Sequence, residues 1–173
     1  MDAPAIRLAA LSDVARIVAL VEAAYRGEPS RAGWTTEADF LGGQRTDDDE
    51  VSALVRGPGS WVLLAERGEM LIGSVLLRDV GDAAYVGMFS VLPTLQGAGL
   101  GRVLLEACEA RARALRRPCL RLTVITIRQE LIAWYERRGF RDTGHREPFP
   151  YGNPRFGLPT REDLEFEVME KPL

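Results

Sequence analysis

The sequence has few of the residues that commonly form cross-links or metal sites. It contains one histidine, His145, and two cysteines, Cys108 and Cys119. A single histidine cannot build a His-based metal site or, alone, the usual serine–histidine–aspartate triad. Both cysteines lie in apolar segments without metal-ligand spacing, so we interpret them as small buried hydrophobic residues in a reducing compartment. We therefore expect no metal and a cytoplasmic location.

Long hydrophobic runs and an excess of positive charge are also missing. No stretch reaches the roughly 20 apolar residues of a membrane helix, and the N-terminus carries Asp2 without an apolar signal core. The formal charge is −3, whereas nucleic-acid-binding domains are usually basic. We expect neither a membrane nor a nucleic acid as partner. The length of 173 residues and the hydrophobic fraction of 46% predict one globular domain over residues 1–173.

Hydrophobic periodicity and breaker residues predict a mixed α/β domain. The clearest helix covers 100–115, where apolar residues share one face over four turns. Residues 61–65, 70–77 and 83–91 predict an antiparallel meander. Further strands are expected at 6–9, 119–124, 140–144 and 164–169. Further helices are expected at 14–25, from 34 to 40, after the acidic run 47–50, and at 130–138, with a stiff proline-rich loop at 148–159.

A glycine-rich turn precedes the clearest helix. Residues 96–102 read QGAGLGR, and unpaired N–H groups at a helix N-terminus bind anions, so a phosphate-bearing ligand is expected. A Walker loop is excluded because the string G-x-x-x-x-G-K-[ST] is absent. A Rossmann fingerprint starting at Gly97 fails at Arg102, and residues 115–124 hold no acidic residue for a ribose. Gln96, Gly99 and Gly101 do satisfy the pattern [RQ]-x-x-G-x-[GA].

Two segments resemble one protein family. Residues 91–102, VLPTLQGAGLGR, resemble the acyl-CoA pyrophosphate motif of the GNAT superfamily of N-acetyltransferases. Residues 134–140, WYERRGF, resemble its later Y-E-[KR]-x-G-F element, and the predicted element order fits. The resemblance implies a GNAT-like central mixed sheet of about seven strands with flanking helices, acetyl-CoA as cosubstrate, and acetyl transfer to an amine.

The resemblance also assigns residues to the donor. Tyr135 corresponds to the general acid that protonates the leaving thiolate, although a core aromatic is the alternative interpretation. The strand starting at Leu120 is expected to diverge from the Phe89 strand and open a slot for the pantetheine arm. An N–H group near Phe89 would polarise the thioester carbonyl. The backbone of Phe89, Ser90 and Val91 would pair with the arm, and Gln96, Gly97, Ala98, Gly99, Leu100, Gly101 and Arg102 would bind the pyrophosphate.

Two positions depart from the family pattern. Many relatives have an asparagine seven residues before the tyrosine, where this chain has Arg128. Arginine can still donate hydrogen bonds to the cofactor, so Arg128 remains a predicted donor-binding residue. Some relatives have a glutamate base where this chain has Thr123. The base is therefore left open between water and a carboxylate of the N-terminal half.

The acceptor site is expected between Tyr25 and Phe40, with Tyr85 on the facing strand. Glu28 and Glu37 could hold an ammonium group, and the alternative for Glu37 is helix capping. Trp34 could pack on the acceptor or belong to the core. The expected acceptor is a small primary amine, while a protein N-terminus or lysine stays open. The loop at 148–159 either walls the pocket or mediates a homodimer.

The expected reaction is direct attack of the amine in a ternary complex. Neither Cys108 nor Cys119 occupies a nucleophile position, so no acyl-enzyme is expected. Two alternatives remain at this stage. One is a non-catalytic acyl-CoA-binding module, and the other is a nucleotide-binding Rossmann-like protein.

Overall fold

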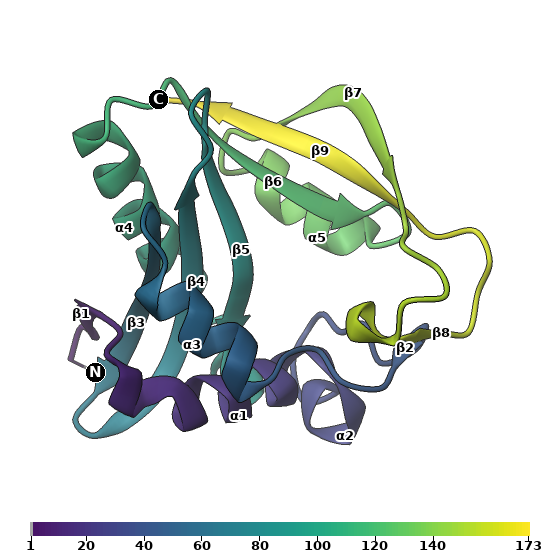
Figure 1. The fold of residues 1–173 in the computed structure, drawn as a ribbon, viewed down its shortest axis with the longest axis horizontal. Helices are drawn as coiled ribbons and strands as arrows, with labels where there is room; N and C mark the ends of the chain where they lie inside the picture. Colours follow the sequence, from purple (N-terminus) through teal and green to yellow (C-terminus); the bar gives the residue numbers. More distant parts are fainter. Residues whose placement is uncertain (1) are drawn as a thin grey trace.

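A seven-stranded sheet forms the centre of the computed structural model, which describes residues 2–173 (Figure 1). The strand order is β1-β3-β4-β5-β6-β9-β7. Strands β5 and β6 are parallel, and the other neighbours are antiparallel. The predicted mixed α/β fold of about seven strands is confirmed. The strands are β1 (Ala5–Leu8), β3 (Ser60–Arg67), β4 (Met70–Asp79), β5 (Ala84–Val91), β6 (Cys119–Ile125), β9 (Glu165–Pro172) and β7 (Arg141–Pro148).

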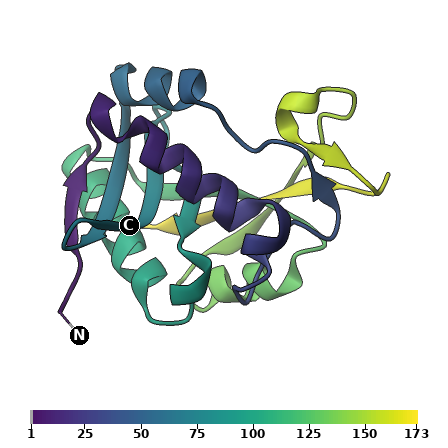
Figure 2. The same ribbon diagram turned by 90° about the horizontal axis from the view of Figure 1, so that it is seen from below.

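Helices cover both faces of this sheet, as Figure 2 shows. Helices α1 (Val14–Tyr25) and α3 (Asp48–Arg56) pack on one face, where Ile17, Val21 and Val51 are buried with residues of β3 and β4. Helix α4 (Leu100–Ala114) packs on the other face, and its predicted apolar stripe lies in the largest core cluster. Helix α5 (Gln129–Glu136) contributes Ile132 and Tyr135 to that same cluster.

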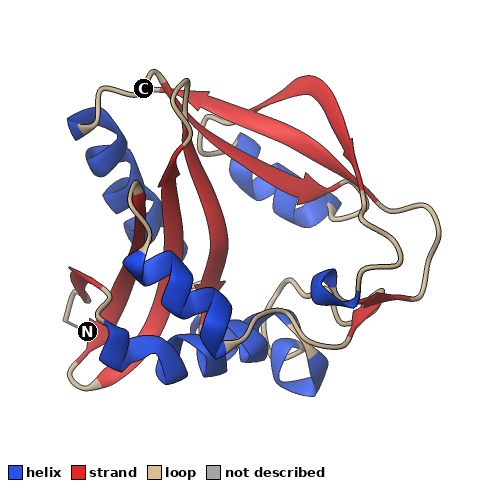
Figure 3. Cartoon of the chain, in the orientation of Figure 1, coloured by secondary structure: helices blue, strands red, loops and turns tan. Residues whose placement is uncertain are grey.

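The prediction of a helix over residues 34–40 is wrong. A single helical turn, α2 (Gly27–Ser30), ends before it, and the chain continues as loop to the short strand β2 (Leu41–Gly42) (Figure 3). The Thr36 hydroxyl explains the difference, because it accepts a hydrogen bond from the Ala38 N–H and contacts the Ser30 hydroxyl. Such side-chain bonds compete with helical backbone bonds.

The C-terminal half also contains structure that the sequence pattern did not predict. The proline-rich loop holds a 3-10 turn (Pro154–Phe156) and strand β8 (Leu158–Pro159), which pairs with β2.

The predicted helix start at the acidic run is confirmed, because the Asp47 carboxylate caps α3 by accepting from the Glu50 N–H at 2.7 Å. In residues 2–173 no helix is long and apolar enough to cross a membrane.

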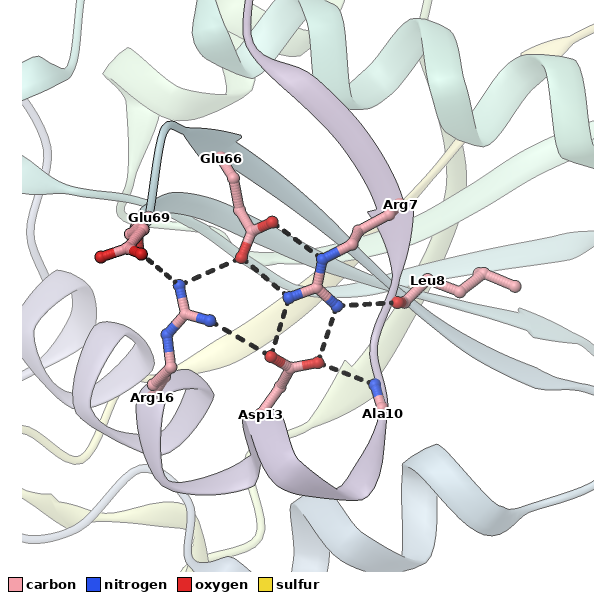
Figure 4. Close-up of polar contacts among 7 residues, drawn as sticks. All are labelled: Arg7, Leu8, Ala10, Asp13, Arg16, Glu66 and Glu69. Carbon is pink, nitrogen blue, oxygen red and sulfur yellow. Dashed lines mark hydrogen bonds and ion pairs between the residues drawn. The ribbon is translucent and has the colours of Figure 1, made fainter.

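A cluster of charged residues fastens edge strand β1 to its neighbours (Figure 4). Arg7 of β1 donates to both carboxylate oxygens of Asp13 and of Glu66, each at 2.8 Å. Arg16 of α1 donates to the same two carboxylates, at 3.2 and 3.0 Å. Asp13 also accepts from the Ala10 N–H at 2.8 Å. The cluster therefore connects β1, β3 and the start of α1.

Candidate active site

The site begins where β5 and β6 separate. The two strands pair at Ala84 with Leu120 and at Tyr85 with Arg121, and beyond these pairs they diverge (Figure 1). The divergence predicted for the strand at Leu120 is confirmed. It leaves the part of β5 from Val86 to Val91 without a neighbour on its β6 side in the described chain.

A bulge changes the direction of β5 at the same place. The register with β4 shifts between Ser74 and Leu76, opposite Met88 and Phe89. Met88 has a φ of 44°, a left-handed conformation that is rare for a residue with a side chain. Bulges of this kind re-aim backbone groups and are common beside active sites. The prediction from sequence missed Met88, and nothing in the local pattern distinguishes it from an ordinary strand residue.

A first cavity of about 220 Å³ lies between β5, the glycine-rich turn and α5. Eight of the residues predicted to bind the donor line it: Phe89, Val91, Gln96, Gly97, Gly99, Gly101, Arg102 and Arg128. The other three lie outside the lining. Leu100 is buried in the core, Ser90 is buried in β5, and Ala98 is exposed. The donor-binding role of all eleven stays a prediction.

The turn before α4 has the conformation that an anion site needs. Gly97 and Gly99 have φ values of 85° and 84°, and no atom lies within 4 Å of the place where a Cβ would stand. Glycine is required there by backbone conformation and not by lack of space. Helix α4 starts at Leu100, so its first N–H groups lack partners within the helix, and Gly99, Gly101 and Arg102 at this end line the first cavity.

The Gln96 side chain links this turn to two other segments. Its Oε1 accepts from the Trp34 N–H at 3.1 Å, and its Nε2 donates to the Val91 carbonyl oxygen at 3.3 Å. A Cβ on Gly33 would stand 2.1 Å from Gln96 Oε1, so glycine is needed for this approach. The sequence pattern assigned Gln96 to the donor through its motif and did not predict these side-chain contacts.

Two residues of the WYERRGF segment that were not predicted as site residues also line the first cavity. The Arg138 guanidinium lies 3.6 Å from the ring centre of Trp134, a cation–π contact. Trp134 packs edge-on against Tyr135, with ring centres 5.1 Å apart, and its ring centre lies 6.5 Å from that of Trp34. Burial, and then Arg137 and Arg102, lower the pKa of Arg138. The four-residue spacing of Trp134 and Arg138 in the helix predicted at 130–138 could have indicated this pair, although α5 itself ends at Glu136.

Tyr135 stands at the inner end of the first cavity. Its side chain is buried and packs against Phe89, Trp134 and Phe140. Burial raises the pKa of Tyr135 above its usual value. The hydroxyl therefore stays protonated at neutral pH.

A second cavity, of about 410 Å³, meets the first one at Tyr135. Five residues line both cavities: Tyr25, Phe89, Arg128, Leu131 and Tyr135. Of the residues predicted for the acceptor, Tyr85 and Glu37 line the second cavity and Trp34 lines the first. Glu28 lies in neither lining and pairs with Arg31 at 3.1 Å on the surface.

Glu37 joins two buried arginines. Its Oε2 accepts from Arg26 Nη1 at 2.6 Å, and its Oε1 accepts from Arg128 Nη1 at 3.0 Å. Arg128 Nη2 also donates to the Thr35 hydroxyl at 2.8 Å. Both carboxylate oxygens of Glu37 thus accept hydrogen bonds from arginines. The contact of Glu37 with an ammonium group stays a prediction. Arg26, 11 residues from Glu37 in the sequence, was not predicted as a site residue.

Neither cysteine lines the first or the second cavity. Cys108 is fully buried in α4, and burial raises its thiol pKa to about 12. Burial also raises the pKa of Cys119, at the start of β6. Neither thiol is primed to form a thiolate at neutral pH. Within residues 2–173 no three His, Cys, Asp or Glu side chains are grouped so that they could hold a metal ion.

Comparisons with known proteins agree with this geometry. The model of the Acetyltransferase (GNAT) family matches residues 17–140. IAA acetyltransferase of Azospirillum brasilense is 34% identical over 114 residues, 64% of this chain and 67% of that protein. Peptidyl-lysine N-acetyltransferase YjaB of Escherichia coli (strain K12) is 29% identical over 118 residues, 67% of this chain and 74% of that protein.

A solved structure has the same fold. The putative acetyltransferase yncA from Salmonella typhimurium, determined with its cofactor acetyl-CoA, superimposes with a TM-score of 0.72. The match covers 99% of this chain and 95% of that chain at 20% sequence identity.

These matches and the cavity geometry define an acyl-CoA-dependent acetyltransferase. The chain belongs to the Acetyltransferase (GNAT) family, whose model covers most of its length. Neither alternative, a non-catalytic acyl-CoA-binding module or a Rossmann-like protein, is favoured by them.

Proposed function

We propose that the protein transfers the acetyl group of acetyl-CoA to the primary amine of a small molecule by direct attack in a ternary complex. One observation carries the proposal: two cavities share Tyr135 as a common wall. Direct transfer needs donor and acceptor bound together within reach of one acid. Two cavities that share a protonated tyrosine can hold the donor and the acceptor together within reach of that acid.

Acetyl-CoA is the cosubstrate, and the first cavity is its site. The N–H groups of the turn from Gly97 to Arg102 bind its pyrophosphate. The β5 segment from Phe89 to Val91 pairs with the pantetheine arm in the way that an added strand would. The solved structure from Salmonella typhimurium, which has the same fold and was determined with acetyl-CoA, supports acetyl-CoA as the cosubstrate.

The reaction exchanges one bond at the acetyl carbonyl carbon. The amine nitrogen forms a bond to that carbon, and the carbon–sulfur bond breaks. The Tyr135 hydroxyl gives its proton to the leaving thiolate, the amine loses one proton to water or a carboxylate, and Tyr135 regains a proton from water to complete the cycle. A backbone N–H of the bulged β5 segment around Met88 stabilises the negative charge on the carbonyl oxygen. Protein cysteines take no part, because Cys108 is buried with a raised thiol pKa.

The size of the second cavity favours a small acceptor. About 410 Å³ lies in the range of small-molecule pockets. Phe149 and Phe156 of the loop at 148–159 line this cavity, which supports the pocket-wall interpretation of that loop. Its role in a homodimer stays a prediction. We also propose a cytoplasmic location, which the two free cysteines support.

The test is the variant Tyr135→Phe, which removes one hydroxyl and keeps the aromatic packing. We expect kcat for acetyl transfer to fall by about 100-fold or more, while the Kd for acetyl-CoA in calorimetry changes little. The matched control is Tyr151→Phe, whose hydroxyl donates to the Arg161 carbonyl oxygen outside both cavities. Unchanged turnover in Tyr135→Phe would remove Tyr135 as the acid, and absence of acetyl-CoA binding to the unmodified protein would overturn the proposed function.

A further inference from the structure

The second cavity has an excess of positive charge. Its lining contains five arginines and three glutamates, although the whole chain has a formal charge of −3. The cavity is therefore opposite in sign to the protein around it. The arginines are Arg26, Arg45, Arg78, Arg128 and Arg155, and the glutamates are Glu37, Glu50 and Glu147.

The ion pairs within the lining leave specific cations unpaired. Glu37 is shared by Arg26 and Arg128, and Arg128 also lies 4.0 Å from Glu130, so these two arginines have carboxylate partners. Glu50 lies 3.9 Å from Arg155. Among residues 2–173, Arg45 has no carboxylate within ion-pair distance, nor has Arg78 at the exposed end of β4. Glu147 is exposed on β7 and likewise lies outside every ion pair of the described chain.

Arg45 is held in position without being neutralised. Its guanidinium carbon lies 4.9 Å from the ring centre of Tyr25, one of the residues that line both cavities. The backbone N–H groups of Arg45 and Thr46 both donate to Glu22 Oε1 at 2.7 Å, which anchors the loop. A half-buried guanidinium fixed on an aromatic ring keeps its donors available for a ligand.

Arg128 supplies a second unused donor at the boundary of the two cavities. The residue is 7% exposed, and its Nε is buried with no hydrogen-bond acceptor in the described chain, because Glu130 Oε1 lies 4.0 Å away, too far for a hydrogen bond. A buried donor without a partner is uncommon and destabilising. A ligand anion beside Arg128 would supply the missing acceptor.

We propose that the acceptor amine carries a carboxylate, which Arg45 and Arg128 bind in the second cavity. This inference rests on the proposed function and narrows its acceptor to free amino acids and similar amine-bearing acids. Arginine–carboxylate contacts are charge-assisted and directional, so they orient the amine as well as bind the acid. The N-terminus of a peptide, whose first carbonyl is an amide, lacks this group.

The experiment compares the standard L-amino acids with their α-carboxamides, measuring thiol release from acetyl-CoA. We expect kcat/KM for accepted acids to exceed that of the matched amides by about tenfold or more, the discrimination expected from a hydrogen bond to a charged group. In Arg45→Gln the KM for the acid rises and the ratio of acid to amide falls toward one. The matched control is Arg113→Gln on the exposed part of α4, which keeps the ratio.

Calorimetry makes the test independent of turnover. With protein saturated by CoA, the acids should bind and the amides should bind at least about tenfold more weakly. Equal use or equal binding of acids and amides, or no binding of any acid, overturns the inference. So does a loss in Arg45→Gln that is equal for acid and amide. The proposed function fails by a different result, namely no acetyl-CoA binding or no acetylation of any amine.

Discussion

The Tyr25 hydroxyl donates a hydrogen bond to the carbonyl oxygen of Phe89 over 3.1 Å. This bond joins the last residue of α1 to β5 at the point where β6 has already diverged. Burial raises the pKa of Tyr25, so the hydroxyl remains a donor at neutral pH. One carbonyl of β5 that has no strand partner thus accepts from a side chain that lines both cavities.

Removing this hydroxyl should weaken the junction of the two cavities. For Tyr25→Phe we expect the free energy of unfolding to fall by about 1 kcal/mol, the value of one hydrogen bond, which corresponds to about 3 °C in Tm. Thermal melts followed by circular dichroism measure the shift. In Tyr85→Phe, whose hydroxyl makes a contact of 3.5 Å, the shift should be smaller. Equal shifts would contradict the assigned role of the Tyr25–Phe89 bond.

Glu37 should be among the most sensitive positions for stability. In Glu37→Gln the two buried guanidinium groups of Arg26 and Arg128 lose their shared carboxylate. We expect a loss of about 3 kcal/mol, because an unpaired buried charge is strongly destabilising. Urea denaturation gives the value.

The matched control for Glu37 is Glu28→Gln, which breaks an exposed pair with Arg31 at 3.1 Å. Its effect should stay below about 0.5 kcal/mol. A loss in Glu37→Gln no larger than in this control would mean that the two arginines are solvated rather than neutralised by Glu37.

Comparing alanine variants of Gly97 and Gly81 distinguishes the effect of backbone strain on stability from an effect on acetyl-CoA binding. Gly97 and Gly81 have φ values of 85° and 89°, and a Cβ would meet no atom within 4 Å at either position. Alanine at either position should therefore reduce stability by about 1 kcal/mol through the left-handed backbone. Only Gly97→Ala should weaken acetyl-CoA binding, since Gly97 lines the first cavity and Gly81 does not. Calorimetry that finds equal affinities in both variants would remove Gly97 from the donor site.

The cluster in Figure 4 predicts an acid-sensitive part of the stability. The Arg7 guanidinium lowers the pKa of Asp13 from 3.8 to about 2, helped by the Ala10 N–H and Arg16 and opposed by burial. The folded state therefore binds this proton less readily than the unfolded state. The stabilisation from Asp13 is complete above about pH 4 and is lost as the pH falls toward 2.

The variant Asp13→Asn isolates this contribution. We expect it to be less stable than the unmodified protein by about 1 kcal/mol at pH 6, a value reduced by the solvent exposure of Arg7 and Arg16. The difference should shrink at pH 2.5. Urea midpoints at both pH values give the comparison, with Glu162→Gln, an exposed loop position, as the control. A difference that does not change with pH would disprove the assignment.

Much of the donor side could be predicted from local sequence. The glycine turn at 96–102 and the helix after it are short-range patterns, in which each residue's role depends on neighbours a few positions away. The start of α3 at Asp47 is local in the same sense. Eight of eleven predicted donor residues consequently line one cavity.

The acceptor side depends on contacts between distant residues, and local patterns could not predict it. Arg128 donates to Glu37, which is 91 positions away in the sequence. The Arg45 guanidinium, from the loop before α3, lies over the ring of Tyr25 in α1. Both kinds of contact hold the segment at 34–40 as a loop, since the Thr36 hydroxyl bonds locally to the Ala38 N–H and Glu37 bonds to arginines outside the segment. The bulge at Met88 reflects strain imposed by the surrounding sheet rather than a residue preference.

The separation of β5 from β6 also affects how the protein responds to its donor concentration. Two residue pairs connect the four N-terminal strands to the three C-terminal ones across the middle of the sheet. A pantetheine arm in that opening would supply backbone hydrogen bonds that the polypeptide leaves unmade. The free energy needed to part the two halves would then grow with the logarithm of donor concentration above its Kd. The bound donor would pair with β5 as an additional strand would, and it would leave with the product. The enzyme would therefore be most resistant to unfolding when the concentration of acetyl-CoA is high.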